Sequence, residues 1–429
     1  MTAVVGILNK HAVALAADSA VTIGGGSGRK IFNKANKVFA LSKQHPVGIM
    51  IYNSASFMAT PWEIIIKVYR KQLNSKSFPT LAEYQNDFIE FLRAKNFYAD
   101  DKIQIHFLEN FIRGVIQSIF VDINGSKNFK GSPTKEYKID FLKNFEKRVD
   151  EIFSFWDSQT NYCNDFKDYK LETFLNYSLK TFEKINDHFF KQSDLTISSE
   201  LELKVKKLMF SILRAKEDRS DYTGLIFTGF GEEEIYPQLI PINISFVVDN
   251  KIRYFIDERR IASISNNNSG AVCPFAQIDV IDTILSGIDP SLDNIYKNNF
   301  VSLFKKYNLA ILESIGSSNP LLSEQIRNLD TDAISVEFNQ LNLQIKREKY
   351  IGPLMSAVSN LAKEDLAEMA ESLIYLTYLK RRITFAEESV GGPVDVAIIS
   401  KGDGFVWIKR KHYFRPELNQ HFFENYFKL

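Results

Sequence analysis

The chain has 429 residues, and its 53 Lys and Arg against 52 Asp and Glu give a formal net charge of +1. This near-neutral balance argues against a general nucleic-acid binder and against a protein held on an acidic membrane surface. Hydrophobic residues make up 45% and charged residues 24%, as in an ordinary globular protein. The length suits two or three domains, or one domain with large insertions.

Cysteine content and local hydrophobicity narrow the class of protein further. Only Cys163 and Cys273 are present, too few for a disulfide framework or a structural zinc site. No stretch approaches the ~20 apolar residues of a membrane span, and the first residues lack the basic segment of a secretory signal. We therefore expect a soluble, cytoplasmic protein without a membrane partner.

The first sixty residues predict strands. Apolar runs at 2–8 and 11–18 are separated by Asn9 and Lys10, which indicates a hairpin. A glycine-rich loop at 24–28 follows, and two more strands are expected at 38–41 and 47–52.

Helices and strands then alternate in blocks. From Pro61 to about Lys216 apolar residues recur at helical spacing. Strands are predicted at 223–229, 238–248, 251–256 and 260–264, a helix at 274–285, further helices to about 382, and a closing hairpin at 394–400 and 405–409. Clustered strands with segregated helices predict an α+β fold in which helical layers cover sheets, rather than a doubly wound parallel sheet.

Thr2 is the first residue with a chemical signal. A small residue after the initiator Met allows an aminopeptidase to expose it as the N-terminus. A free N-terminal threonine carries a hydroxyl nucleophile and its own base, because the α-amine has a pKa of about 7.7–8.0. That amine is close enough to neutrality to accept the hydroxyl proton.

The predicted hairpin brings an acid toward this threonine. If Asn9 and Lys10 form the loop, the numbers of facing residues sum to 19 and Thr2 lies opposite Ala17, one residue from Asp18. A register change of one residue brings Asp18 directly opposite. Asp18 is suited to hold a lysine whose charge lowers the pKa of the Thr2 hydroxyl. The candidates that follow the glycine-rich loop are Lys30, Lys34 and Lys37.

Two segments at the start of the chain resemble a known family. The runs Thr2-Ala-Val-Val-Gly-Ile and Val13-Ala-Leu-Ala-Ala-Asp18-Ser19 are similar to the start of mature proteasome β subunits and of the bacterial HslV peptidase, which are N-terminal-nucleophile (Ntn) hydrolases. The family has an Asp sixteen residues after its Thr, as Asp18 follows Thr2 here. Its lysine is matched best by Lys37-Val-Phe, with Lys30-Ile-Phe as a competing match.

The resemblance continues near the other end and in the middle. The run from Ser389 to Ile399 is similar to the family's Ser-Gly-Gly-x-x-Asp-Val-Ala-Val-Ile, and Glu387 and Ser389 are the candidates to support the terminal amine. Asn268-Ser269-Gly270 looks like the Gly-Ser-Gly before a helix, whose serine assists catalysis. Asn53 stands where the family has the glycine whose amide is the oxyanion donor. Strict alignment of the C-terminal glycines puts Val390 on the serine's place.

What the resemblance implies is a four-layer α/β/β/α sandwich acting as a threonine-type hydrolase of peptide or amide bonds. Thr2 is then the nucleophile, Asp18 and Lys37 tune it, Ser269, Glu387 and Ser389 assist, and the Asn53 amide stabilises the oxyanion. Ala20 and Thr22 line the substrate strand. No cofactor or metal is needed. The implied partners are a peptide or protein substrate, further copies of the chain in a homo-oligomer, and an unfoldase or regulatory protein.

The resemblance does not cover the whole chain. The expected Ntn-hydrolase core comprises residues 1–60, 217–286 and 350–429. The stretch 61–216 is expected to be a helical insertion and 287–349 a smaller one. Two other functions stay open: a catalytically inactive proteasome-like scaffold, and an amidase of the same superfamily that acts on a small molecule.

Overall fold

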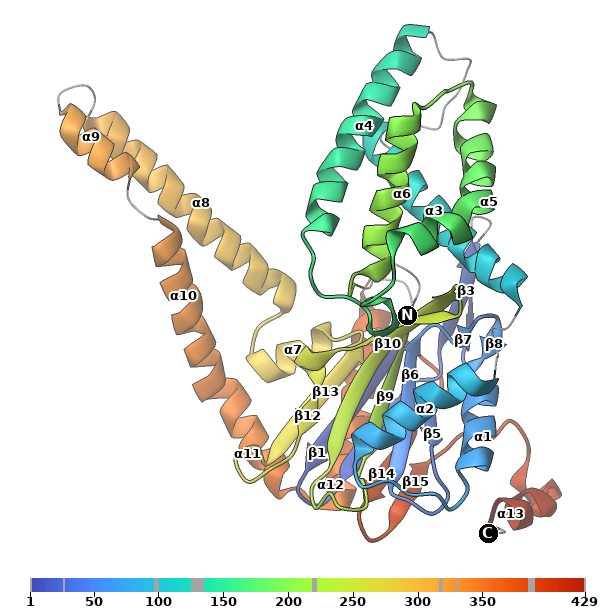
Figure 1. Ribbon diagram of the computed structural model, residues 1–429. Coiled ribbons are helices and arrows are strands. Elements are labelled where there is room, and N and C mark those ends of the chain that lie inside the picture. Colours follow the sequence, from blue (N-terminus) through green and yellow to red (C-terminus); the bar gives the residue numbers. More distant parts are fainter. Residues whose placement is uncertain are drawn as a thin grey trace. The chain divides into compact units, whose positions relative to one another are not determined.

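The computed structural model describes residues 2–25, 28–95, 100–124, 135–217, 222–315, 319–328, 331–384 and 390–427. The chain forms two compact units. The first contains Met1–Tyr52, Thr228–Leu239 and Ala262–Leu429, and the second Asn53–Phe227 and Ile240–Ile261. Figure 1 labels their helices and strands. Within the described residues, every helix is too short or too polar to cross a lipid bilayer.

A five-stranded sheet forms the centre of the first unit. Its strand order is β13-β1-β2-β14-β15, and each neighbouring pair is antiparallel. Short apolar runs with a high content of Val, Ile and Ala explain these strands, because such side chains pack well on a pleated, buried surface. The strands are β1 (Ala3–Asn9), β2 (Val13–Ala17), β13 (Gly270–Ala276), β14 (Asp395–Ser400) and β15 (Gly404–Lys409).

Both faces of this sheet are covered. On one face, alternate residues such as Val5 and Ile7 pack on helices α11 (Gly352–Asn360) and α12 (Lys363–Ile383). On the other face lie β5 (Val38–Ala40) and β6 (Val47–Asn53), and a Cβ added at Gly6 would be in van der Waals contact with Met50 of β6, at 3.7 Å. One helical layer and two β layers are thus stacked in the first unit.

The first unit also contains a helical hairpin that carries the smaller expected insertion. Its members are α8 (Pro290–Ile315), α9 (Pro320–Arg327) and α10 (Thr331–Lys346). The rings of Phe300 and Phe338 stack with centroids 3.9 Å apart, and Lys346 pairs with Asp293 at 2.6 Å. The other helices and strands of the first unit are β3 (Val21–Gly25), β4 (Gly28–Phe32), β12 (Ala262–Ser263), α7 (Asp279–Ser286) and α13 (Gln420–Phe427).

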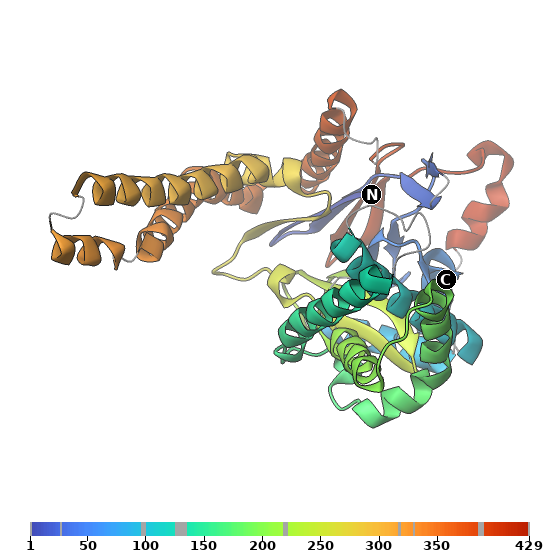
Figure 2. The same ribbon diagram turned by 90° about the horizontal axis from the view of Figure 1, so that it is seen from above.

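The second unit contains the long helical block predicted between Pro61 and Lys216. Phe120 lies at its centre, with ring centroids of four other phenylalanines 5.0–5.7 Å away. Helices α3 to α6 pack on one another and group together in Figure 2. The helices are α1 (Trp62–Leu73), α2 (Leu81–Lys95), α3 (Asp101–Asn124), α4 (Lys135–Asp157), α5 (Leu171–Phe189) and α6 (Ser199–Arg214).

Strands complete the second unit. They are β7 (Ser56–Phe57), β8 (Thr60–Pro61), β9 (Thr223–Gly229), β10 (Gln238–Val248) and β11 (Lys251–Ile256), of which the last two are antiparallel. The bounds of β9, β10 and β11 agree with the prediction. The mixed architecture with antiparallel sheets confirms the coarse α+β expectation, while the complete four-layer sandwich stays a prediction.

Three local predictions are wrong. The β1–β2 loop lies one residue later than predicted: the Asn9 amide donates to the Ala12 carbonyl at 3.0 Å, so Lys10 and His11 lie between this bonded pair, and facing residues sum to 21 rather than 19. Pro274 lies inside β13, and the helix predicted at 274–285 begins only at Asp279. Parts of the expected glycine-rich loop belong to the hairpin of β3 and β4, since Gly24 pairs with Arg29.

Candidate functional site

The Asp18 carboxylate is the centre of the candidate site. It follows the end of β2, is 1% exposed and accepts four hydrogen bonds. Its Oδ1 accepts from the Ala3 amide at 2.9 Å and from Lys37 Nζ at 2.6 Å. Its Oδ2 accepts from the amides of Ala20 at 3.0 Å and Gly391 at 3.1 Å. A buried carboxylate that accepts this many hydrogen bonds holds its donors in place.

Lys37 is the lysine that the structure pairs with Asp18. It precedes β5, is 3% exposed and also donates to the Ala20 carbonyl at 2.6 Å. Burial lowers the pKa of its ammonium below the ordinary 10.5, and the adjacent Asp18 charge opposes that change. Of the other candidates, Lys34 is exposed, and the Lys30 side chain lies outside the described part of the chain.

Thr2 is held at its carbonyl side. It is 3% exposed, the Gln277 amide donates to its carbonyl at 3.1 Å, and the next amide, that of Ala3, donates to Asp18. The observed register of β1 and β2 explains this contact. Because the numbers of facing residues sum to 21 and not to the predicted 19, Asp18 lies directly opposite Ala3. The Ala3 amide and Lys37 Nζ share one carboxylate oxygen, so Thr2, Asp18 and Lys37 lie together.

Ser269 does not lie at this end of the sheet. Since β13 runs antiparallel to β1, Gly270 faces Asn9 while Ala276 faces Ala3. The assisting role expected for Ser269 therefore has no support from its position. The residues beside Thr2 are Ala276, whose φ is +66°, and Gln277, which is 6% exposed. The sequence did not predict a role for these two residues, because Pro274 was interpreted as the start of a helix. The apolar run before Pro274 is typical of a strand.

Five other predicted site residues have different outcomes. Ala20 is buried and uses both its N–H and its C=O within the site. Thr22 belongs to β3, paired with Ile31. Asn53 ends β6, is exposed and has a φ of +64°, the strained value expected where glycine is usual. Glu387 and Ser389 lie outside the described residues.

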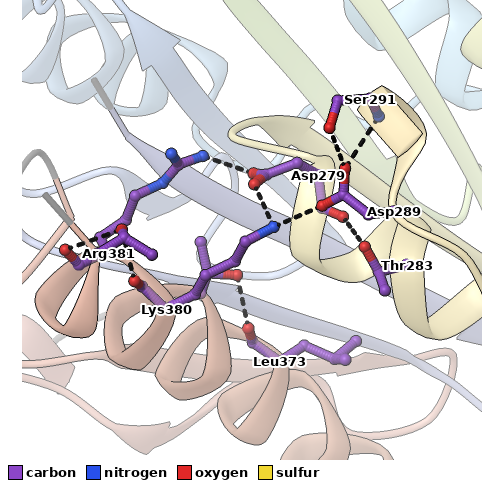
Figure 3. A network of polar contacts seen from close by, with 9 residues as sticks. Asp279, Thr283, Asp289, Ser291, Leu373, Lys380 and Arg381 are labelled. Carbon is purple, nitrogen blue, oxygen red and sulfur yellow. Dashed lines mark hydrogen bonds and ion pairs between the residues drawn. The ribbon is translucent and has the colours of Figure 1, made fainter. Parts of the chain in front are cut away.

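An ion-pair network braces the two segments that reach the site (Figure 3). Asp279, the first residue of α7, pairs with Lys380 at 2.9 Å and with Arg381 at 2.6 Å in the last turn of α12. Lys380 also pairs with Asp289 at 2.9 Å. Gln277, which donates to the Thr2 carbonyl, lies two residues before Asp279. The network therefore connects the segment that contacts Thr2 to α12, the helix that precedes Gly391 in the chain.

Gly392 allows the chain to turn back into the site. Its φ is +77°, and an added Cβ would lie 2.9 Å from the backbone oxygen of Asn33. We expect Gly392→Ala to lower the free energy of unfolding by about 1–3 kcal/mol, because an L-residue is strained there, and to move the Gly391 amide away from Asp18. Urea denaturation measures the loss. Gly402→Ala is the control, since a Cβ there meets nothing within 4 Å; equal stability of the two variants contradicts the prediction.

A second buried ion pair, which the sequence analysis missed, lies next to the first. Asp395 begins β14 directly opposite Ala17, the residue before Asp18, and is 2% exposed. Its Oδ1 accepts from the Lys411 amide at 2.9 Å, and its Oδ2 pairs with Lys411 Nζ. Asp395 is visible in the sequence as the acid of the C-terminal motif, but no pattern indicates that a lysine sixteen residues later returns to it.

Comparison with known proteins finds a distant likeness among solved structures. No family model matches the chain, and no curated protein matches it. Among solved structures, a chain described as the Anbu (Gly-1) mutant from Hyphomicrobium sp. strain MC1 has a weak similarity to it, with a TM-score of 0.28 and 8% sequence identity. The alignment covers 99% of this chain and 94% of that one.

Proposed function

We propose that the protein is a threonine-type Ntn hydrolase that cleaves peptide or amide bonds. The observation that carries this proposal is the buried Asp18–Lys37 pair attached to the amide that follows Thr2. A hydroxyl nucleophile needs a nearby base and an environment that stabilises its anion. The α-amine of Thr2 supplies the base once Met1 is removed, and the Lys37 ammonium stabilises the developing negative charge on Thr2 Oγ.

The reaction has two steps in this proposal. Thr2 Oγ attacks the substrate carbonyl carbon, its proton passes to the α-amine, and the amine of the broken bond leaves with a proton. The resulting ester on Thr2 is hydrolysed by water, which regenerates the hydroxyl. The Asn53 amide is the proposed donor to the oxyanion, an assignment that rests on the family resemblance. Residues 387 and 389 keep their proposed role in supporting the amine.

Two measurements on the purified protein test this function. Intact mass spectrometry should give the mass of the chain without Met1, because a retained methionine blocks the amine. The processed protein should then release the chromophore from peptide anilides. A retained Met1, or turnover unaffected by blocking the α-amine, overturns the threonine mechanism. Turnover of small amides without turnover of any peptide favours the small-molecule amidase instead.

The helical block from Pro61 to about Lys216 is proposed to control access or assembly rather than chemistry. It contains none of the residues gathered around Asp18. We expect a variant in which this block is shortened to α1 and α2 to hydrolyse a small chromogenic amide at a rate within a few-fold of wild type, while its substrate size limit or oligomeric state changes. Size-exclusion chromatography and a peptide length series measure these two properties. A folded variant that loses small-amide turnover while keeping both properties contradicts the assignment.

A further inference from the structure

Asp395 and Lys411 have no role in the proposed reaction, yet little of either side chain is exposed. The exposed fractions of the two side chains are 3% and 10%. Burying a charge costs free energy unless the charge is paired. Even a paired buried charge often adds little to the free energy of unfolding, so stability alone does not explain this pair. Lys411 reaches Asp395 with both its amide and its ammonium, so both oxygens of the carboxylate are used.

The position of this pair points toward Lys37. Asp395 faces Ala17 across β2 and β14, and Asp18 is the next residue of the chain. Successive side chains of a strand point to opposite faces of the sheet. Val396 and Ile398 pack on the helix-covered face, so Asp395 points to the other face. That face contacts β5, and Lys37 is the residue directly before β5. Within the described part of the chain, the charged groups that act on Lys37 are Asp18 after β2, Asp395 on β14 and Lys411 after β15.

We infer that Asp395 and Lys411 act as a positioning pair for Lys37: their two charges set the electrostatic field at its ammonium. The inference rests on the proposed function for its catalytic consequence. The positive charge of Lys411 lowers the pKa of Lys37, and the negative charge of Asp395 raises it. The segment after β15 is therefore part of the electrostatics of the site, although it lies more than 370 residues from Lys37 in sequence.

Opposite changes in the pair have opposite expected effects. Lys411→Met leaves the Asp395 charge in place, so the pKa of Lys37 should rise. Asp395→Asn leaves the Lys411 charge in place, so that pKa should fall. The double variant removes both charges and should return it close to the wild-type value. A purely structural role for the pair does not produce shifts of opposite sign.

The experiment measures Lys37 directly, without depending on turnover. The full-length protein is labelled with ¹³C at lysine Cε, the Lys37 signal is assigned with Lys37→Arg, and its chemical shift is followed with pH. The same variants are assayed for the alkaline limb of anilide hydrolysis, where loss of the Lys37 charge should end activity. Lys409→Met is the matched control, because Lys409 pairs with Glu371 and is 57% exposed.

The outcomes separate the two proposals. Shifts of opposite sign in the Lys37 titration support the positioning pair, and matching shifts of the alkaline limb add its catalytic role. A Lys37 titration that is the same in all folded variants, or that moves equally in Lys409→Met, overturns the inference even if Thr2-dependent hydrolysis is observed. Shifts of the expected sign in a protein without Thr2-dependent hydrolysis keep the electrostatic coupling and overturn the proposed function. If Lys411→Met does not fold, Asp395→Asn and the double variant decide.

Discussion

Thr2→Ala should reduce hydrolysis at least about a hundredfold and leave the folded structure intact. The hydroxyl is the proposed nucleophile, and losing a nucleophile removes nearly all of the rate that depends on it. Alanine keeps a small residue at the start of β1, and the backbone bonds from Gln277 and to Asp18 do not involve the threonine side chain. Initial rates with a peptide anilide, alongside circular dichroism and thermal unfolding, measure the two halves of this prediction.

Thr2→Ser is the control that keeps the chemistry. Serine retains a hydroxyl and a free amine after removal of Met1, so part of the activity should remain. Processing of Met1 has to be confirmed by mass in each variant, since alanine and serine also permit it. If Thr2→Ala retains more than about 1% of wild-type turnover with unchanged folding, the nucleophile lies elsewhere and the threonine mechanism is wrong.

The sequence allowed a good prediction of the strands that carry the site. Alternating or continuous apolar runs bounded by turn residues fixed β9, β10 and β11 to the residue, and the hydrophobic hairpin at the start of the chain placed Thr2 near Asp18. Periodicity could not fix which two residues form the loop between β1 and β2. The Asn9 side chain closes that loop by accepting from the amides of His11 and Ala12, a local choice that no hydrophobic pattern encodes.

Contacts between distant segments were harder to predict. Lys37 and Lys30 have almost the same local sequence, and only the tertiary position of Lys37 before β5 identifies it as the partner of Asp18. Gln277 and Lys411 were missed for the same reason, because each reaches the site from the end of a strand whose pairing is non-local. Spacing along the chain constrains local structure, whereas a buried ion pair depends on which strand ends meet.

Lys37→Met should reduce hydrolysis about a hundredfold or more, nearly as severely as Thr2→Ala. Methionine fills a similar volume, so the change removes the charge rather than the packing. Loss of one electrostatic stabiliser in an active site typically slows a reaction 10²–10³-fold. Asp18 retains three amide donors, and the expected loss in the free energy of unfolding is about 1–3 kcal/mol. Steady-state rates and urea denaturation at pH 7 measure the two effects.

Neighbouring lysines and pH provide the controls for this prediction. Lys34→Met and Lys30→Met should be mild, and an essential Lys30 contradicts the assignment of the lysine. The pKa of Lys37 is lower in the folded chain than in the unfolded chain, where it is near 10.5. At a pH between these two pKa values, the unfolded state therefore binds more protons than the folded state. Stability therefore rises with pH in that window. The wild type should gain stability relative to Lys37→Met as the pH approaches 10.5, and a difference that does not change with pH contradicts a strained buried cation.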